Sequence, residues 1–252
     1  MSEPAQRRHP LAAHGSLRRE QIERIRRRHR GYRLLLATST LVVLLQPLAQ
    51  RWPLLNSLAA IVLALVMMLF LTRFSPLRAH RKSFYGLGIA AIASELLWMF
   101  GLAHWPALTI HLASLHLVIW TLFIGAFLLR KSLALMLEPY VTKAVVMGAA
   151  AGYLLIGYLG AFLLHTLLLW HPDAFDLSQL PPGVDPVHSP QRAFPAMEVA
   201  SFGALTTSGS AIAQPGEVLA STGCLVITIL GQLYVAVLIA LILGRFHRRS
   251  GI

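Results

Sequence analysis

Long apolar runs separated by short polar segments fill most of the chain. Six runs stand out, at residues 34–50, 54–72, 84–103, 108–129, 141–170 and 218–244. A helix needs roughly 20 mostly apolar residues to cross a bilayer. The first run is short and is weakened at its end by Gln46 and Pro47, but membrane helices tolerate proline where neighbouring groups satisfy the backbone. The pattern predicts an all-α membrane protein with six transmembrane helices.

Composition agrees with this prediction. Hydrophobic residues make up 56% of the 252 residues and charged residues only 13%, whereas a soluble domain carries about 25% charged residues. The single cysteine, Cys224, excludes a disulfide within the chain. No group of His, Cys, Asp and Glu residues has the spacing of a zinc site. The sequence also shows no pattern of Ser, His and Asp that indicates a catalytic triad. We therefore expect no metal site, no cofactor and no enzymatic activity.

The basic residues are distributed unevenly along the chain, which has a formal net charge of +12. Ten arginines lie in residues 1–33, and most of the others lie in the links 73–82 and 130–143 and in the tail 245–249. Lys and Arg accumulate on the cytoplasmic side of membrane proteins, so this alternation predicts that both termini are cytoplasmic. We expect residues 1–33 to be a basic cytoplasmic segment that contacts anionic lipid headgroups rather than nucleic acid.

The four runs within residues 34–130 predict a four-helix transmembrane domain. A voltage sensor needs several charges within the membrane field. In the fourth run the basic residues Arg130 and Lys131 lie at the end, outside the apolar stretch. We therefore expect this domain to lack the arginines of a voltage sensor. Glu95 and His116 lie at similar expected depths in neighbouring helices. They could form a structural hydrogen bond or a pH-sensing pair, because ionisable residues within a membrane usually pair.

Two further histidines, His111 and His165, are expected near the outer boundary as interface residues whose ring nitrogens have partners. They lie close to the ends of the fourth and fifth apolar runs.

The segment between the last two apolar runs is polar and then weakly apolar. Residues 171–192 hold three aspartates. This segment would either concentrate cations at the outer mouth of a pore or be an ordinary solvated loop. Residues 194–207 are too few to span a bilayer, and Pro195 suits the first turn of a helix. Glu198 would then favour the positive end of the helix dipole. We expect a short helix that enters the membrane and returns through S-G-S-A-I-A-Q-P-G, lining a wet space.

The final third resembles the pore domain of the tetrameric potassium-channel family, especially its bacterial six-span members. The matching residues are Ala200-Ser201-Phe202, Leu205-Thr206-Thr207, Gly209, Pro215 and the run from Gly231 to Ala240. The resemblance covers roughly residues 141–246 and implies a pore domain at 131–246, followed by a short cytoplasmic tail at 247–252. It also implies a homotetramer in a bacterial plasma membrane that conducts potassium.

By this resemblance, six residues of the sequence would line an ion pathway. They are Thr206, Thr207, Ser208, Gly209, Ser210 and Ala211. The family pattern is T-V-G-Y-G-D, whose backbone carbonyls replace the water around the ion, whereas this chain reads T-S-G-S-A-I from Thr207. If Ala211 needs a positive φ, it is disfavoured by roughly 1–2 kcal/mol. We therefore expect altered or weak potassium selectivity, with sodium as a second permeant ion.

In the last apolar run, Gly223 and Gly231 are each either a gating hinge or a close packing position, since small residues are common at membrane helix interfaces. The function predicted overall is passive cation conduction by a pore-forming subunit. A non-conducting regulatory or assembly subunit with the same fold is the alternative. A small transporter is less favoured, because the first three and last three runs show no matching repeat.

Overall fold

The computed structural model describes residues 10–71, 81–104, 109–138, 142–186, 189–209 and 212–250, and every long element among them is a helix. In chain order the helices are α1 (Pro10–Ala49), α2 (Pro53–Leu69), α3 (Arg81–His104), α4 (Thr109–Met136), α5 (Lys143–Trp170), α6 (Pro190–Leu205) and α7 (Val218–Ser250). Two single-turn 3₁₀ helices, Pro172–Ala174 and Leu177–Gln179, lie between α5 and α6. The predicted all-helical class is confirmed for the described part of the chain.

Five helices contain stretches long and apolar enough to cross a membrane, namely α1, α3, α4, α5 and α7. In α2 the apolar part, Leu54–Leu69, is shorter, and the whole helix has 17 residues. Length and composition together support an integral membrane protein.

Several helix ends differ from those expected. α1 is one helix of 40 residues, so no break separates the basic segment that ends at residue 33 from the first apolar run. α4 continues to Met136, beyond the expected end at 129. α7 continues to Ser250, so the expected tail at 247–252 is largely helical. A helix makes its backbone hydrogen bonds internally, and it can therefore continue beyond the point where its side chains become polar.

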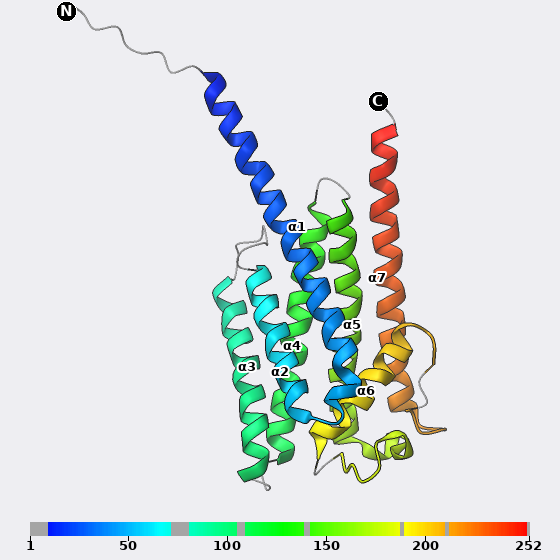
Figure 1. Cartoon of the computed structure of the whole chain (residues 1–252). Coiled ribbons are helices and arrows are strands. Elements are labelled where there is room, and N and C mark those ends of the chain that lie inside the picture. Colours follow the sequence, from blue (N-terminus) through cyan, green and yellow to red (C-terminus); the bar gives the residue numbers. More distant parts are fainter. Residues whose placement is uncertain are drawn as a thin grey trace, which may run out of the picture.

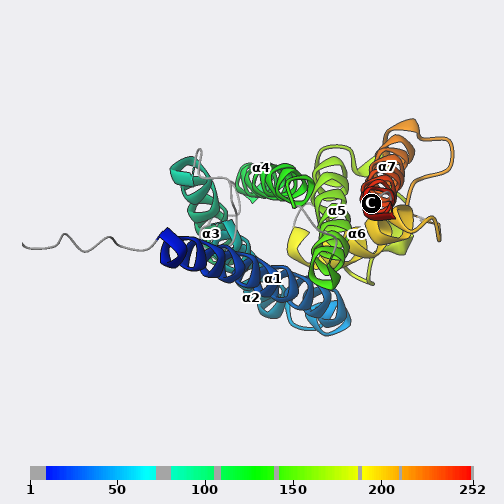
Figure 2. The ribbon, with the colours of Figure 1, turned by 90° about the horizontal axis from the view of Figure 1, so that it is seen from above.

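The long helices run roughly side by side, with the N-terminal end of α1 and the C-terminal end of α7 at the same end of the molecule (Figure 1). The shorter α6 lies obliquely near the opposite end (Figure 1). α5 occupies a central position and packs against α1, α4, α6 and α7 (Figure 2). α7 stands at the edge of the bundle and contacts chiefly α5 and α6 (Figure 2).

Glycines allow α5 to take this central position. A Cβ at Gly148 would run into the ring of Tyr32 in α1. A Cβ at Gly157 would run into the ring of Phe202 in α6, which lies as close as 2.5 Å to that position. Small residues at helix interfaces let large neighbours approach the backbone, which is a common packing device in membrane bundles.

Polar contacts tie the basic part of α1 to the link between α4 and α5. Arg28 Nη1 lies 3.0 Å from Glu138 Oε1, and the hydroxyl of Tyr32 donates to the same oxygen at 3.3 Å. His29 Nε2 lies 3.3 Å from the hydroxyl of Thr142, the residue that caps α5. These contacts fix the direction of α1 relative to the bundle.

Candidate functional site

The helix α6 begins earlier than expected. Pro190 occupies its first turn, and Pro195 lies inside the helix rather than at its start. The expected position of Glu198 near the positive end of the helix dipole is therefore wrong, because Glu198 lies at the middle of α6. The sequence Ser189-Pro190 was the overlooked signal, since proline favours the first position of a helix.

Contacts with α5 hold α6 in place. The hydroxyl of Ser201 donates to the carbonyl oxygen of Gly157 at 2.7 Å. The ring of Phe202 meets that of Tyr158 edge-on, with centroids 5.7 Å apart. A helix whose backbone contacts a neighbour this closely cannot rotate or slide freely, so the end of α6 is held in a defined place.

The last carbonyl groups of α6 are bound by hydroxyl groups from two other helices. A helix leaves its last four carbonyl oxygens without partners inside the helix. Thr228 Oγ1 of α7 donates to Ala204 O at 2.8 Å, and the Tyr153 hydroxyl of α5 donates to Leu205 O at 3.0 Å. The C-terminal end of α6 is therefore fastened on two sides by neutral donors.

We expect Thr228→Val and Tyr153→Phe each to lower the free energy of unfolding by about 0.5–1.5 kcal/mol, because each removes one such hydrogen bond. Thermal unfolding of the purified protein in detergent measures the change. Thr222→Val is the matched control, because Thr222 is an exposed residue of the same helix. Equal melting temperatures for Thr228→Val and Thr222→Val would show that the hydroxyl does not support α6.

The segment after α6 leaves helical geometry at once. Thr207 has a φ of 58° and Gly209 a φ of 99°. A left-handed conformation is uncommon for a β-branched residue such as threonine and marks a constrained backbone. The residues from Thr206 to Gly209 are all exposed. This loop thus presents hydroxyl groups and backbone carbonyls at the surface.

Hydroxyl groups in the loop bind one another and the end of α6. Thr206 Oγ1 donates to Phe202 O at 2.7 Å and lies 3.0 Å from Ser208 Oγ. Thr207 Oγ1 donates to Thr206 O at 2.6 Å. The predicted pathway residues Ser210 and Ala211 lie outside the described residues.

The chain that follows the loop is pinned to the segment after α5. The amide of Asp176 donates to Ile212 O at 2.8 Å, and the amide of Gln214 donates to Ala174 O at 3.0 Å. Hydrogen bonds from the hydroxyl and then the amide of Ser178 hold the pKa of Asp176 below its ordinary value. This carboxylate, which lies outside the membrane-spanning helices, therefore remains ionised beside the returning chain.

Both predicted glycines of α7 face neighbouring helices. A Cβ at Gly231 would run into the side chain of Leu205 at the end of α6. At Gly223 a Cβ would lie 3.0 Å from Leu167 and 3.1 Å from Leu164, both in α5. The geometry favours close packing at both positions, while their role in gating stays a prediction.

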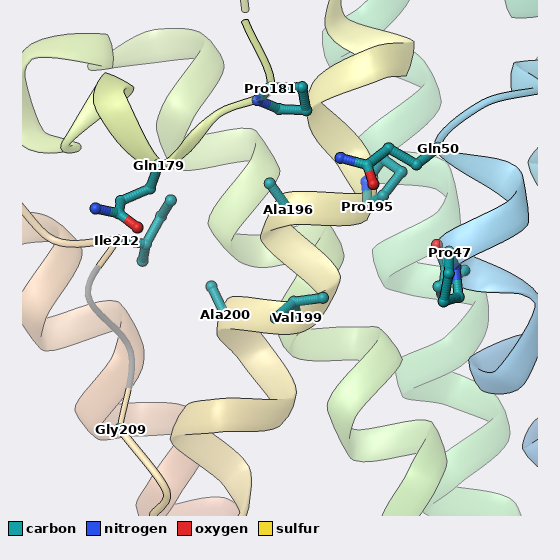
Figure 3. A pocket seen from close by; sticks show the side chains of 11 residues that line it. Pro47, Gln50, Gln179, Pro181, Pro195, Ala196, Val199, Ala200, Gly209 and Ile212 are labelled. Atoms are coloured by element: carbon teal, nitrogen blue, oxygen red, sulfur yellow. The ribbon is translucent and has the colours of Figure 1, made fainter.

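A cavity of about 380 Å³ lies between the C-terminal end of α1, the exposed face of α6 and the loop (Figure 3). Its wall includes Gln50 from the α1–α2 link, Val199 and Ala200 from α6, and Gly209 and Ile212 from the loop side (Figure 3). An adjoining cavity of about 410 Å³ is bordered by the loop and by Glu198, among other residues. The loop is therefore flanked by open space on the side of α1.

Glu198 is a buried carboxylate that the sequence reasoning did not single out as a site residue. It is 1% exposed, and neither of its oxygens has a well-aligned hydrogen-bond donor among the described residues. The neighbouring Tyr158 hydroxyl donates instead to Ser39 O at 3.2 Å. A glutamate within the apolar stretch A-M-E-V-A was the signal that could have identified it, because buried ionisable residues in membranes mark functional sites by default.

Glu95 and His116 lie close together, with Oε2 and Nε2 3.5 Å apart and both side chains buried. They lie in α3 and α4, away from the chain segment that forms the loop. The expectation that His165 is an interface residue with satisfied nitrogens is wrong. His165 is 1% exposed, and neither ring nitrogen has a partner among the described residues.

Comparison with known proteins does not assign a function to this site. No protein-family model matches the sequence, no curated protein matches it, and no solved structure matches the fold. The likeness to potassium channels therefore rests on the residues of α6, the loop and α7 alone.

Proposed function

We propose that this protein is the pore-forming subunit of a homotetrameric cation channel. The observation that carries the proposal is the exposed loop Thr206–Gly209, which is rich in hydroxyl and carbonyl groups and begins the link from α6 to the largely apolar α7. Non-helical backbone at membrane depth is tolerated only inside protein or beside water. Four copies around one axis would place four such loops along a shared aqueous path.

The surface of α7 supports an assembly of several copies. Only 11% of its apolar stretch is buried within one chain, against 67% of that of α5. Lipid could cover the apolar residues, but the exposed Thr222 and Gln232 need water or protein partners. A second copy or a water-filled cavity would satisfy them.

The proposed membrane topology has six crossings. α2 would be the sixth, since 17 residues at 1.5 Å each span about 26 Å, close to the hydrocarbon thickness. α6 would be a re-entrant helix. An even number of crossings fits Figure 1, in which the start of α1 and the end of α7 lie at the same end of the molecule. The distribution of Lys and Arg supports a cytoplasmic position for that end, with the basic part of α1 against anionic lipid. The resemblance to bacterial channels favours a bacterial plasma membrane.

The loop residues favour weak selectivity. Potassium selectivity depends on closely placed carbonyl groups, and in this chain Ser210 and Ala211 stand where the family pattern has Tyr and Gly. Serine hydroxyls would instead hold a wider, hydrated path for potassium and sodium.

Ion flux through the purified protein in liposomes tests this proposal. We expect the native protein to pass potassium and sodium at similar rates. The double variant Ser210→Tyr with Ala211→Gly should favour potassium, because it restores two residues of the family pattern. Chemical cross-linking of the same samples should give a tetramer.

The second candidate is a non-conducting subunit with the same fold. It is favoured by Ile212, which is buried at the position where the family pattern has an aspartate. A tetramer that is silent as the native protein and in the double variant would support this candidate and exclude the channel. Monomers or dimers with coupled solute uptake would instead indicate a transporter.

A further inference from the structure

A buried polar cluster joins the four-helix part of the molecule to the start of α6. Its centre is Glu95 of α3 and His116 of α4, which are 4% and 5% exposed. Glu95 Oε2 lies 3.5 Å from His116 Nε2, and the other ring nitrogen of His116 lies 3.4 Å from Ser94 Oγ. Both nitrogens of His116 thus have polar neighbours.

A second imidazole faces the same small cavity. His165 of α5 lines a cavity of about 30 Å³ together with Glu95 and His116. Neither nitrogen of His165 has a hydrogen-bond partner among the described residues. One water molecule needs a space of this order and two to four polar partners. The two orphaned nitrogens and the Glu95–His116 pair supply such partners.

Among the described residues that line this cavity there is no lysine or arginine to balance a carboxylate. From α2 it is faced by Asn56 and Ser57, and from α6 by Gln191, none of which titrates. Arg192, the next residue along α6, is exposed. In the described part of the chain, the titratable groups that line the cavity are therefore Glu95, His116 and His165.

Aromatic rings cover the cluster. Trp98 stacks on His116 with centroids 4.9 Å apart, and Phe194 lies 5.6 Å from His165. In such surroundings a net charge is far more costly than a neutral acid–base pair. Glu95 and His116 can avoid a net charge by holding one proton between them, as neutral acid with neutral imidazole or as an ion pair.

We propose that this cavity is a proton-binding site, in which one water molecule links His165 to a Glu95–His116 pair that holds one shared proton. The site reaches α6 directly, because Gln191 Nε2 donates to Trp98 O at 3.0 Å and Phe194 lies against His165. Proton binding is thereby connected to the N-terminal end of α6. The proposal is independent of ion conduction.

The sign of the pH dependence follows from counting protons. In the unfolded chain above about pH 7, glutamate is ionised and histidine is neutral. The folded cluster then binds one proton more than the unfolded chain, so stability falls as pH rises. Below the ordinary histidine pKa, the unfolded chain binds more protons because both imidazoles charge, and stability falls as pH drops. We expect stability to be highest between these two pH ranges. In the alkaline range the equilibrium constant for unfolding should change by up to tenfold per pH unit.

The experiment is thermal unfolding of the purified protein in detergent at pH values from about 6 to 9, which brackets the histidine pKa. We expect the melting temperature of the native protein to fall from pH 7 to pH 9. Glu95→Gln should make this alkaline fall less steep, because glutamine needs no proton to be neutral. Glu217→Gln is the matched control, since Glu217 is exposed, and it should behave as the native protein does.

A change in melting temperature from pH 7 to pH 9 that is the same in Glu95→Gln as in the native protein would overturn the proposal. Other buried ionisable groups, Glu198 and Lys131 among them, are present in both proteins and cancel in this comparison. A high-resolution experimental structure tests the water, which should lie within hydrogen-bond distance of His165. None of these measurements depends on ion flux, so their failure is distinct from failure of the proposed channel function.

Discussion

Gly203→Ala is expected to displace the loop that follows α6 and, if the protein conducts ions as proposed, to abolish ion flux. A Cβ at position 203 would run into the carbonyl oxygen of Gly209, which is backbone and cannot turn aside as a flexible side chain could. Overpacking of this kind costs about 1–3 kcal/mol. The loop must therefore move away from α6, and Thr206, Thr207 and Ser208 would move with it.

Gly125→Ala is the matched control for this change. Gly125 lies within α4, and a Cβ there would meet nothing within 4 Å. Removing a glycine from a helix interior stabilises by about 1 kcal/mol, so this variant should melt at the same or a higher temperature. Melting temperature and liposome flux, measured for both variants, test whether a side chain at position 203 displaces the loop. Normal flux in Gly203→Ala would show that the loop is not held against α6 as described.

Lys131→Met is expected to raise the stability of the folded protein. Lys131 is fully buried, and its Nζ has no hydrogen-bond acceptor among the described residues. It lies beside Gly152 of α5, where the hydroxyl of Tyr234 from α7 also lies. A buried polar group without a partner costs about 1–3 kcal/mol. Methionine fills similar space without a charge, so we expect a gain of that order.

The control for this substitution is Lys143→Met, because Lys143 is exposed at the start of α5. Exposed substitutions change stability by about 0.5 kcal/mol or less. The free energy of unfolding, measured for both variants at one pH, gives the comparison. A loss of stability in Lys131→Met alone would contradict this expectation and show that the buried ammonium group stabilises the fold.

Helix existence was predictable, because it depends on local composition. The apolar runs that became α4, α5 and α7 begin at nearly the expected residues, since the chain must satisfy its backbone internally where it crosses a membrane. Helix ends were less predictable. Polar residues follow the apolar part of α7, but its backbone bonds continue to Ser250.

The candidate site was predictable in part. The non-helical backbone predicted from Ser208 onward is present, but the helix ends at Leu205 rather than at the expected Thr207. The start of α6 was placed too late, because Pro195 resembled an N-terminal proline while Pro190 holds that position. The close approach of Glu95 to His116 agrees with their expected similar depth. Whether any of these residues touches an ion stays a prediction.

The sequence by itself determined the class of protein, the apolar helices and the place of the loop, because each depends on residues near one another in the chain. Tertiary structure alone decided three things: that Thr228 and Tyr153 hold the end of α6, that Lys131 is buried, and that His165 joins Glu95 and His116 at one cavity. These contacts join residues that are many positions apart. They depend on which faces of the helices meet, and that is set by packing of the whole bundle rather than by any local pattern.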